Sequence, residues 1–440
     1  MGKRAIIIAA PSSGSGKTTI TLSILRALRR QGIRVASCKA GPDYIDSAFH
    51  TMASGIPCRN VDPSAMRPET LRQQIADAAA DAEFVVIEGV MGLFDGNLTA
   101  DVAALLGLRV ILVLDVAGQI ESAAAVAKGF ATFRADVEIA GVILNNVGSP
   151  RHAQLIRSAF ETVGIPIVGV VPRQNDLVLP SRHLGLVQAR EHADIESFLN
   201  QAAVMCGECI NLAQIMDIAT PIATAPVSSR TIPVAPLGQR IAVARDEAFA
   251  FSYPHILDGW RDDGAELTFF SPLANQGPID GVDAVYLPGG YPELHAGRLS
   301  ANSVFLSALR DAAAQGTAIY GECGGYMVLG ESLTDAAGVV HPMLGLLPVN
   351  SSIAERRLHL GYRVATLYDS GPLGAAGSSV STHEFHYATA VERPEESSPL
   401  FRITDPDGAM RTMGLARGRV CGSFLHLIDR VAAPQGFEPR

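Results

Sequence analysis

Short apolar runs alternate with longer amphipathic segments along the first half of the chain. The runs are rich in Ile, Val and Leu, which is typical of strands buried on both faces of a parallel sheet. The segments between them have apolar residues at helical spacing. This alternation predicts an α/β domain with a doubly wound parallel sheet. The predicted strands are residues 4–10, 35–39, 83–88, 110–115, 139–146 and 167–173.

The alternating pattern stops between residues 219 and 238. This stretch is rich in Pro, Ser and Thr and has neither helical nor strand periodicity, so it predicts an extended linker. A new apolar run begins at Arg240, and strand and helix patterns then alternate again. We therefore expect two α/β domains, residues 1–218 and 239–440, joined by the linker 219–238.

The first predicted strand runs directly into a loop rich in Gly and Ser, which an amphipathic helix follows. Such a loop turns backbone N–H groups toward phosphate oxygens, so it predicts ATP binding at the start of the helix. The register is a variant, because Pro11 occupies the position of the usual first Gly. An ordinary glycine-rich turn is the alternative. The predicted ATP-binding residues here are Ser13, Gly14, Ser15, Gly16, Lys17, Thr18 and Thr19.

Carboxylates near the ends of the predicted strands indicate a Mg²⁺ site. Glu88 ends the strand over residues 83–88, at the edge of the sheet where a cation bridging ATP phosphates would lie. The hydroxyl of Thr18 and the carboxylate of Asp46 are the other expected ligands. Asp95 is a weaker candidate, for which a turn residue before Gly is the alternative.

A polar cluster follows the second predicted strand, in the segment Lys39-Ala-Gly-Pro-Asp-Tyr-Ile-Asp46. We expect Lys39, Asp43 and Tyr44, together with Asp95, to contact the substrate that accepts the phosphate. A solvated turn is the alternative. Asn145, near the end of a later strand, is predicted to contact the adenine of ATP, with a helix cap or a turn as the alternative.

The second domain carries a cysteine at a sharp strand-to-helix turn. Cys323 follows one apolar run and precedes another, and flanking glycines permit the strained backbone of an exposed nucleophile. The amide of Gly324 and an amide near Gly290 predict an oxyanion hole. His426 ends a third apolar run and is the predicted base that keeps Cys323 deprotonated. A lone His at a strand end is more often structural.

Composition excludes several classes of protein. The 35 basic and 44 acidic residues give a formal net charge of −9, and no basic run is long enough to suggest a nucleic-acid partner. No apolar stretch approaches the roughly 20 residues needed to span a membrane, and no signal peptide precedes the first strand, so we expect a cytoplasmic protein. The six cysteines are no disulfide framework, and Cys206 and Cys209 lack a second ligand pair for a metal.

Together the motifs resemble those of the a,c-diamide synthases of cobyrinic or hydrogenobyrinic acid, whose second domain is a class I glutamine amidotransferase. The resemblance covers both domains. It implies that Cys323 releases ammonia from glutamine through a thioester, while ATP and Mg²⁺ convert an acetate group of a corrinoid into an acyl phosphate that ammonia attacks. The motifs are 10–19, Lys39-Ala-Gly-Pro-Asp-Tyr-Ile-Asp46, Glu88-Gly-Val-Met-Gly-Leu-Phe-Asp95, 179–186, 288–291, 321–326, His383-Glu-Phe-His-Tyr387 and 423–426.

One position departs from the class I amidotransferase pattern. Many such domains have Glu two residues after the catalytic His, but Ile428 stands there. The resemblance therefore implies a Cys-His dyad more firmly than a triad. Asp429 and Glu384 are candidates for the missing carboxylate, with the start of a helix as the alternative for Asp429. The segment around Glu384 lacks the H-E-x-x-H spacing, so no catalytic metal is expected there.

The resemblance implies that the partners are a corrinoid polyacid, L-glutamine and ATP. A homodimer is a possible assembly. The polyanionic acceptor favours basic contacts from Lys39, Arg173 or Arg182. A metal-free corrin is slightly favoured over a cobalt corrin. Cobyric acid synthases and sirohydrochlorin diamide synthases are the alternatives within the enzyme class. A P-loop switch ATPase with an inactive second module is the alternative from another class.

Overall fold

A computed structural model describes residues 2–96, 98–174, 177, 181–182, 185–186, 194–222, 230–404 and 408–431. The chain divides into two compact units, which we describe separately. The first consists of Met1–Ser64 and Pro68–Ser229, and the second of Ala65–Arg67 and Arg230–Arg440. No helix within the described residues is both long and apolar enough to cross a membrane.

The first unit is built around a mostly parallel sheet with strand order β3-β2-β4-β1-β5-β6-β7, and β10 pairs antiparallel to β1. These strands are β1 (Arg4–Ala9), β2 (Val35–Ala40), β3 (Arg59–Val61), β4 (Phe84–Glu88), β5 (Val110–Asp115), β6 (Ile139–Val147), β7 (Ile167–Pro172) and β10 (Thr220–Pro221), with a separate pair of β8 (Ser181–Arg182) and β9 (Gly185–Leu186).

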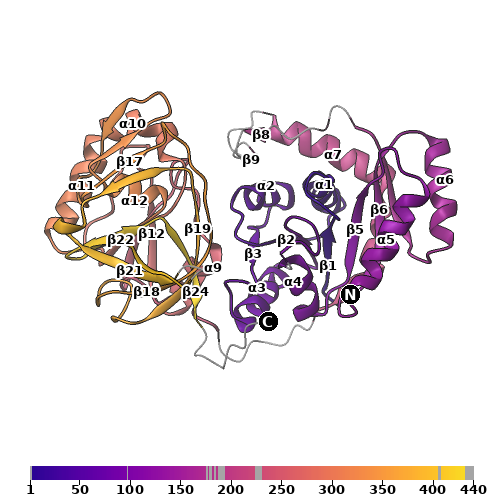
Figure 1. Ribbon diagram of the computed structural model, residues 1–440, viewed down its shortest axis with the longest axis horizontal. Coiled ribbons are helices and arrows are strands. Elements are labelled where there is room, and N and C mark those ends of the chain that lie inside the picture. Colours follow the sequence, from indigo (N-terminus) through magenta and orange to yellow (C-terminus); the bar gives the residue numbers. More distant parts are fainter. Residues whose placement is uncertain are drawn as a thin grey trace. The chain divides into compact units, whose positions relative to one another are not determined.

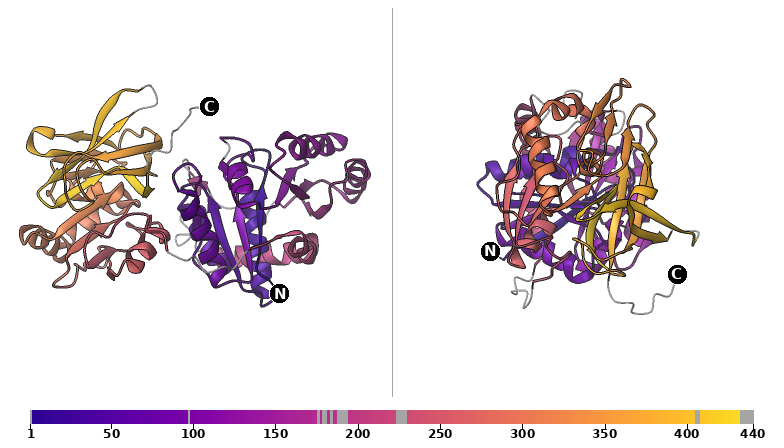
Figure 2. Two further views of the ribbon diagram at one scale, coloured as in Figure 1. Left: turned by 90° about the horizontal axis from the view of Figure 1, so that it is seen from below. Right: turned by 90° about the vertical axis from the view of Figure 1, so that its left-hand side faces the viewer.

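Helices cover both faces of this sheet. Figure 1 shows α1, α2 and α7 on one side of it and α3 and α4 on the other, and the left view of Figure 2 shows its strands running side by side. The helices are α1 (Lys17–Arg30), α2 (Ile45–Ser54), α3 (Pro68–Ala80), α4 (Leu98–Leu106), α5 (Glu121–Phe133), α6 (Pro150–Glu161), α7 (Ile195–Cys209) and α8 (Leu212–Ile218).

The order of the strands determines where the functional loops meet. In β1, Ile6, Ile7 and Ile8 are fully buried because the strand has a neighbour on each side and helices above and below. The strand β4 lies next to β1 and β2 lies next to β4, both in parallel register, so the carboxyl ends of the three strands share one edge of the sheet. Loops at this edge are where ligands bind in doubly wound sheets.

The second unit has a ten-stranded sheet of order β12-β11-β13-β14-β23-β22-β21-β18-β19-β24. Its first five strands are parallel and the following pairs are antiparallel. These strands are β11 (Arg240–Ala244), β12 (Glu266–Phe270), β13 (Ala284–Leu287), β14 (Ala318–Glu322), β18 (His359–Leu367), β19 (Ser379–His386), β21 (Ser398–Thr404), β22 (Met410–Arg417), β23 (Val420–Ser423) and β24 (Leu425–Arg430).

A smaller sheet of order β16-β15-β17-β20 completes the second unit together with four α-helices and two short 3₁₀ helices among its described residues. The strands are β15 (Ser332–Thr334), β16 (Val340–Pro342), β17 (Val349–Ser352) and β20 (Thr389–Glu392). The helices are α9 (Pro254–Asp262), α10 (Ala296–Ala301), α11 (Ser303–Ala314), α12 (Gly324–Leu329), η2 (Pro292–His295) and η3 (Pro394–Glu396).

Two local expectations from the sequence were wrong. The stretch 219–238 was expected to contain no strand, but Thr220 and Pro221 form β10 because they pair with Ala5 and Arg4. His426 was expected where a strand ends, but it lies inside β24, which begins at Leu425. Asp429 lies in the same strand and does not start a helix.

Candidate functional sites

The glycine-rich loop lies between β1 and α1, as its sequence predicts. Gly14 and Gly16 have φ angles of 81° and 91°, which glycine adopts without strain. A Cβ atom on Gly16 would lie 2.3 Å from Nδ2 of Asn145, so a larger residue does not fit there. Gly16 precedes α1 without a side-chain cap, and the N–H groups of the first helical turn can therefore donate hydrogen bonds to a bound anion.

Lys17 and Thr18 begin α1 and face the end of β4 and the loop that follows it. Nζ of Lys17 donates a hydrogen bond to the backbone oxygen of Met91 at 2.5 Å. Burial lowers the pKa of Lys17, because a charged ammonium loses hydration there. Oγ1 of Thr18 donates to Oε1 of Glu88 at 2.8 Å. Ser13 is exposed in the loop, and Thr19 lies in the first turn of α1.

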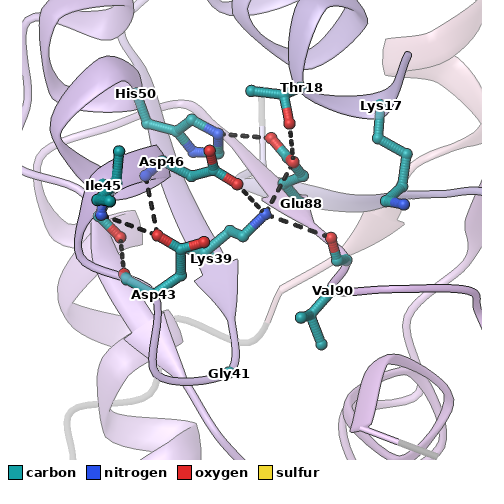
Figure 3. A network of polar contacts seen from close by, with 12 residues as sticks. Lys17, Thr18, Lys39, Gly41, Asp43, Ile45, Asp46, His50, Glu88 and Val90 are labelled. Atoms are coloured by element: carbon teal, nitrogen blue, oxygen red, sulfur yellow. Dashed lines mark hydrogen bonds and ion pairs between the residues drawn. The ribbon is translucent and has the colours of Figure 1, made fainter. Parts of the chain in front are cut away.

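Glu88 is the centre of a buried network at the end of β4 (Figure 3). Its Oε1 accepts from Lys39 at 2.8 Å as well as from Thr18, and its Oε2 lies 2.6 Å from Nε2 of His50. Nζ of Lys39 also lies 2.5 Å from Oδ2 of Asp46. The three carboxylate and hydroxyl side chains therefore bring hard oxygen atoms to one place, which is the donor set that Mg²⁺ requires.

The charges in this network balance one another. Burial opposes ionisation of Glu88, but the charge of Lys39 and the hydrogen bond from His50 hold the pKa of this carboxyl well below its ordinary value. Burial raises the pKa of Asp46 to about 6, although Lys39 opposes this shift. Burial alone would lower the pKa of His50, but the adjacent Cys58 and Glu88 raise it. Glu88 is therefore a carboxylate at neutral pH despite complete burial.

The other predicted substrate and nucleotide residues have varied surroundings. Oδ1 of Asp43 accepts from the N–H groups of Ile45 and Asp46, so this side chain caps the first turn of α2. Tyr44 is half-buried at the same helix start, whereas Asp95 is exposed in the loop after β4. Nδ2 of Asn145 donates to the backbone oxygen of Ser15 at 3.0 Å, which supports the glycine-rich loop.

Three basic residues, Lys39, Arg173 and Arg182, were expected to contact the polyanionic acceptor. Arg173 is exposed after β7, and the side chain of Arg182 lies outside the described residues. Lys39 is only 3% exposed and is paired with two carboxylates. Contact between Lys39 and the acceptor stays a prediction.

The second site is the turn between β14 and α12. Cys323 has a φ of 48° and a ψ of −105°, a conformation that is strained for a residue with a Cβ atom. Its backbone N–H donates to Ser423 at 2.8 Å, and its Sγ lies 3.7 Å from the backbone oxygen of Phe385. Strained strand-to-helix turns of this kind present nucleophiles in other enzymes.

Glycines surround Cys323. A Cβ atom on Gly324 would lie 3.0 Å from the backbone nitrogen of Gly290, so the two predicted oxyanion-hole glycines are neighbours. A Cβ atom on Gly289 would lie 2.5 Å from Cε1 of His426 and 3.4 Å from Cβ of Cys323. The loop after β13 therefore packs directly on the nucleophile and the base, with room only for glycine at position 289.

His426 is 1% exposed and lies opposite His383 in the pairing of β24 with β19. It is in hydrogen-bonding contact with Cys323, and its Nδ1 lies 3.6 Å from Oε2 of Glu322. Burial opposes the charged imidazolium, but Cys323 and Glu322 raise the pKa of His426 to about 10. Cys323, His426 and Glu322 thus form one continuous chain of polar side chains.

The two carboxylates considered for a triad are engaged elsewhere. Glu384 pairs with Arg363 at 3.2 Å and lies 3.3 Å from His386. Asp429 is fully buried and accepts from Arg67, which belongs to the second unit, at 2.9 Å.

Among the described residues, His359, Glu384 and His386 are one group with the spacing of metal ligands. The two imidazole rings are stacked, with centroids 4.5 Å apart and planes 4° from parallel. Their lone pairs, which lie in the ring planes, are therefore parallel and do not converge on one ion.

Two family descriptions match the chain, one for each site. Residues 6–187 match the CobQ/CobB/MinD/ParA nucleotide binding domain, and residues 240–432 match the CobB/CobQ-like glutamine amidotransferase domain. A hydrogenobyrinate a,c-diamide synthase of Brucella abortus is 52% identical over 97% of this chain and 98% of its own length. The chain belongs to the hydrogenobyrinate a,c-diamide synthase family. A relative with that name from Rhizobium meliloti is 53% identical over 96% of this chain and 99% of its own length. Another, from Mesorhizobium japonicum, is 49% identical over 98% of this chain and 100% of its own length.

Sequence reasoning missed two members of these sites in this diamide synthase family member. His50 lies one helical turn after Asp46 on α2, a spacing that places both on one face of the helix and was a usable signal. Glu322 precedes Cys323 directly, but adjacency in sequence gives no sign that its side chain faces His426. That contact depends on the pairing of β14 with β23, which leads into β24.

Proposed function

We propose that this protein uses ATP and glutamine to convert the a and c acetate carboxylates of hydrogenobyrinic acid into amides, in cobalamin biosynthesis. The names of the full-length relatives support this acceptor, and family descriptions of a nucleotide binding domain and a glutamine amidotransferase domain match the chain. The reaction class is a carbon–nitrogen ligation with glutamine as the nitrogen donor. The division into two sites has a chemical reason, because a carboxylate offers no leaving group and ammonia is mostly protonated at neutral pH.

The first unit is proposed to phosphorylate the corrinoid carboxylate. The N–H groups of the loop around Gly14 and Gly16 bind the phosphates of ATP, and Lys17 neutralises charge that develops as the phosphoryl group is transferred. Thr18, Glu88 and Asp46 would hold Mg²⁺, and their clustered oxygen atoms fit that ion. Mg²⁺, when bound, supplies charge neutralisation to the phosphate oxygens.

Lys39 and His50 keep Glu88 ionised and oriented in this scheme. Their contacts with its two oxygens fix the carboxylate in one rotamer before a nucleotide binds. Asp43 positions α2 through its cap, which in turn places Asp46. Contacts of Tyr44 and Asp95 with the acceptor, and of Asn145 with adenine, are part of the proposal.

The second unit is proposed to release ammonia from glutamine. The thiolate of Cys323 attacks the side-chain carbonyl, the oxyanion is stabilised by the N–H groups near Gly290 and Gly324, and ammonia leaves after a proton from His426 reaches the nitrogen. Water then hydrolyses the thioester, with His426 acting as the base. The buried, strained position of Cys323 beside His426 is the observation that carries this part.

The test is a reaction of the purified protein with glutamine, Mg²⁺, ATP and hydrogenobyrinic acid, in which the corrinoid product is analysed by mass spectrometry. We expect two carboxyl groups to become amides, with ADP and glutamate formed in equal amounts. Cobyrinic acid and sirohydrochlorin serve as matched acceptors. Conversion of either of these in preference to hydrogenobyrinic acid would contradict the proposed acceptor. Gel filtration of the same sample tests for a homodimer, and cell fractionation tests the expected cytoplasmic location.

A further inference from the structure

Glu322 is a buried carboxylate whose position is fixed from two neighbouring strands. It ends β14 and is 3% exposed. Its Oε1 accepts from the backbone N–H of Leu427 in β24 at 3.1 Å, and its Oε2 accepts from the hydroxyl of Tyr286 in β13 at 2.8 Å. Both donors are neutral, so neither cancels the negative charge that this carboxylate presents to its surroundings.

The same Oε2 atom lies 3.6 Å from Nδ1 of His426. This is an ion-pair distance, and a shortening of about half an ångström makes it a hydrogen bond. Because Nδ1 faces the carboxylate, Nε2 is the nitrogen left for Cys323. A carboxylate on one imidazole nitrogen selects the tautomer in which that nitrogen carries the proton, and it stabilises the imidazolium formed during catalysis.

We propose that Glu322 is the positioning residue that orients His426 and holds it in the tautomer that serves Cys323. This inference rests on the glutaminase half of the proposed function. Many class I amidotransferases have a Glu at the position of Ile428. In this chain, the residue before the nucleophile would supply the carboxylate instead. The contacts of Asp429 with Arg67 and of Glu384 with Arg363 agree with this assignment.

The ionisable groups near His426 determine how a substitution of Glu322 changes the pKa of His426. Among the described residues, three ionisable side chains lie near His426: Cys323 from the turn after β14, Glu322 from β14 itself, and His383 from β19. Burial, together with the charge of His426, lowers the pKa of His383 to about 3, so that ring is neutral over the assay range. Burial and Glu322 raise the pKa of Tyr286 well above its ordinary value, so it is neutral as well. Removal of the negative charge at position 322 therefore lowers the pKa of His426.

The test compares Glu322→Gln with the unchanged protein by two readouts that need no corrinoid. The first is the pH profile of kcat/KM for glutamine hydrolysis, and the second is the rate at which iodoacetamide alkylates Cys323 across the same pH range. We expect kcat/KM to fall by about 100-fold or more, because His426 loses the carboxylate that orients its ring and stabilises its imidazolium form. We also expect the alkaline limbs of both profiles to move to lower pH.

Glu392→Gln is the matched control. Glu392 also accepts a hydrogen bond from a tyrosine, Tyr326 at 2.7 Å, but it belongs to β20 of the smaller sheet. This variant should keep the glutaminase profile of the unchanged protein. Glu322→Asp is the conservative variant, which keeps the charge but draws it back by one methylene. It should lose about tenfold in kcat/KM and keep its alkaline limb close to that of the unchanged protein.

Two outcomes would overturn the inference. One is a Glu322→Gln protein whose rate and alkaline limbs match those of Glu392→Gln. The other is an equal loss in Glu322→Gln and Glu322→Asp without movement of either limb, which indicates a structural role alone. If Glu322→Gln does not fold, Glu322→Asp decides, and an unchanged rate in that variant refutes positioning. Failure of the proposed function is distinct, since it appears as absent glutamine hydrolysis in the unchanged protein.

Discussion

A single added methyl group at Gly289 should disable the glutaminase site. A Cβ atom there would lie 2.5 Å from Cε1 of His426, whereas carbon atoms in contact are ordinarily about 3.5–4.0 Å apart. The two groups must therefore separate by about 1 Å. His426 is 1% exposed and has no solvent to move into. The distance to Cβ of Cys323, 3.4 Å, is an ordinary contact, so the displacement falls mainly on His426.

The size of the effect follows from that displacement. A shift of about 1 Å in a catalytic group costs about 100-fold in rate, and overpacking of the site costs about 1–3 kcal/mol of stability. We therefore expect Gly289→Ala to lower kcat/KM for glutamine hydrolysis by about 100-fold. Formation of ADP with ammonia as the nitrogen donor should be unchanged, because the ATP site lies in the other unit.

Glutamine hydrolysis is measured as glutamate release, and ADP formation as coupled NADH oxidation, on the same preparations. Gly371→Ala is the matched control, because nothing lies within 4 Å of a Cβ atom at that position and its φ is not positive. A Gly289→Ala protein that hydrolyses glutamine as fast as Gly371→Ala would refute the reasoning. A loss of ammonia-dependent ADP formation in parallel with glutaminase activity would refute it as well.

Three further predictions concern other parts of the two sites. Glu88→Gln should lower ADP formation by about 100-fold with either glutamine or ammonia, and it should leave alkylation of Cys323 unchanged. The control Glu138→Gln removes a carboxylate from an exposed ion pair and should alter neither ADP formation nor alkylation. Asp43→Ala should destabilise the start of α2 by about 1 kcal/mol, seen as faster amide hydrogen exchange there, and equal exchange would contradict the cap. Because the pKa of His426 is raised to about 10, its charged form is lost only as pH rises through that value. Glutaminase kcat/KM should therefore fall only near pH 10, and a decline centred near the ordinary pKa of His would contradict this.

The sequence predicts the first unit well because each functional loop follows a strongly apolar strand. The predicted strand over residues 110–115 matches β5 in full, and 4–10 differs from β1 by one residue. Parallel order then brings the ends of β1, β2 and β4 together. Thr18, Asp46 and Glu88, expected near one another on that ground, do share one network with Lys39.

The remaining features depend on packing that no local pattern records. His50 shares one face of α2 with Asp46, but only tertiary structure shows its nitrogen at Glu88. The carboxylate beside His426 comes from β14, which is adjacent to β23 through parallel pairing over nearly 100 residues of sequence. Asn145 is predicted to contact adenine, and only the structure shows that its amide also donates to the backbone oxygen of Ser15 in the glycine-rich loop.

Transfer of nitrogen from glutamine to the corrinoid tests the central claim most directly. The protein is supplied with hydrogenobyrinic acid, ATP, Mg²⁺ and glutamine whose side-chain amide carries heavy nitrogen, and the product is analysed by mass spectrometry. The account predicts a product with two heavy amide nitrogens. Cys323→Ala should incorporate none from glutamine but two from heavy ammonium. A product without heavy nitrogen from the unchanged protein, or equal incorporation from glutamine by Cys323→Ala, would contradict the account.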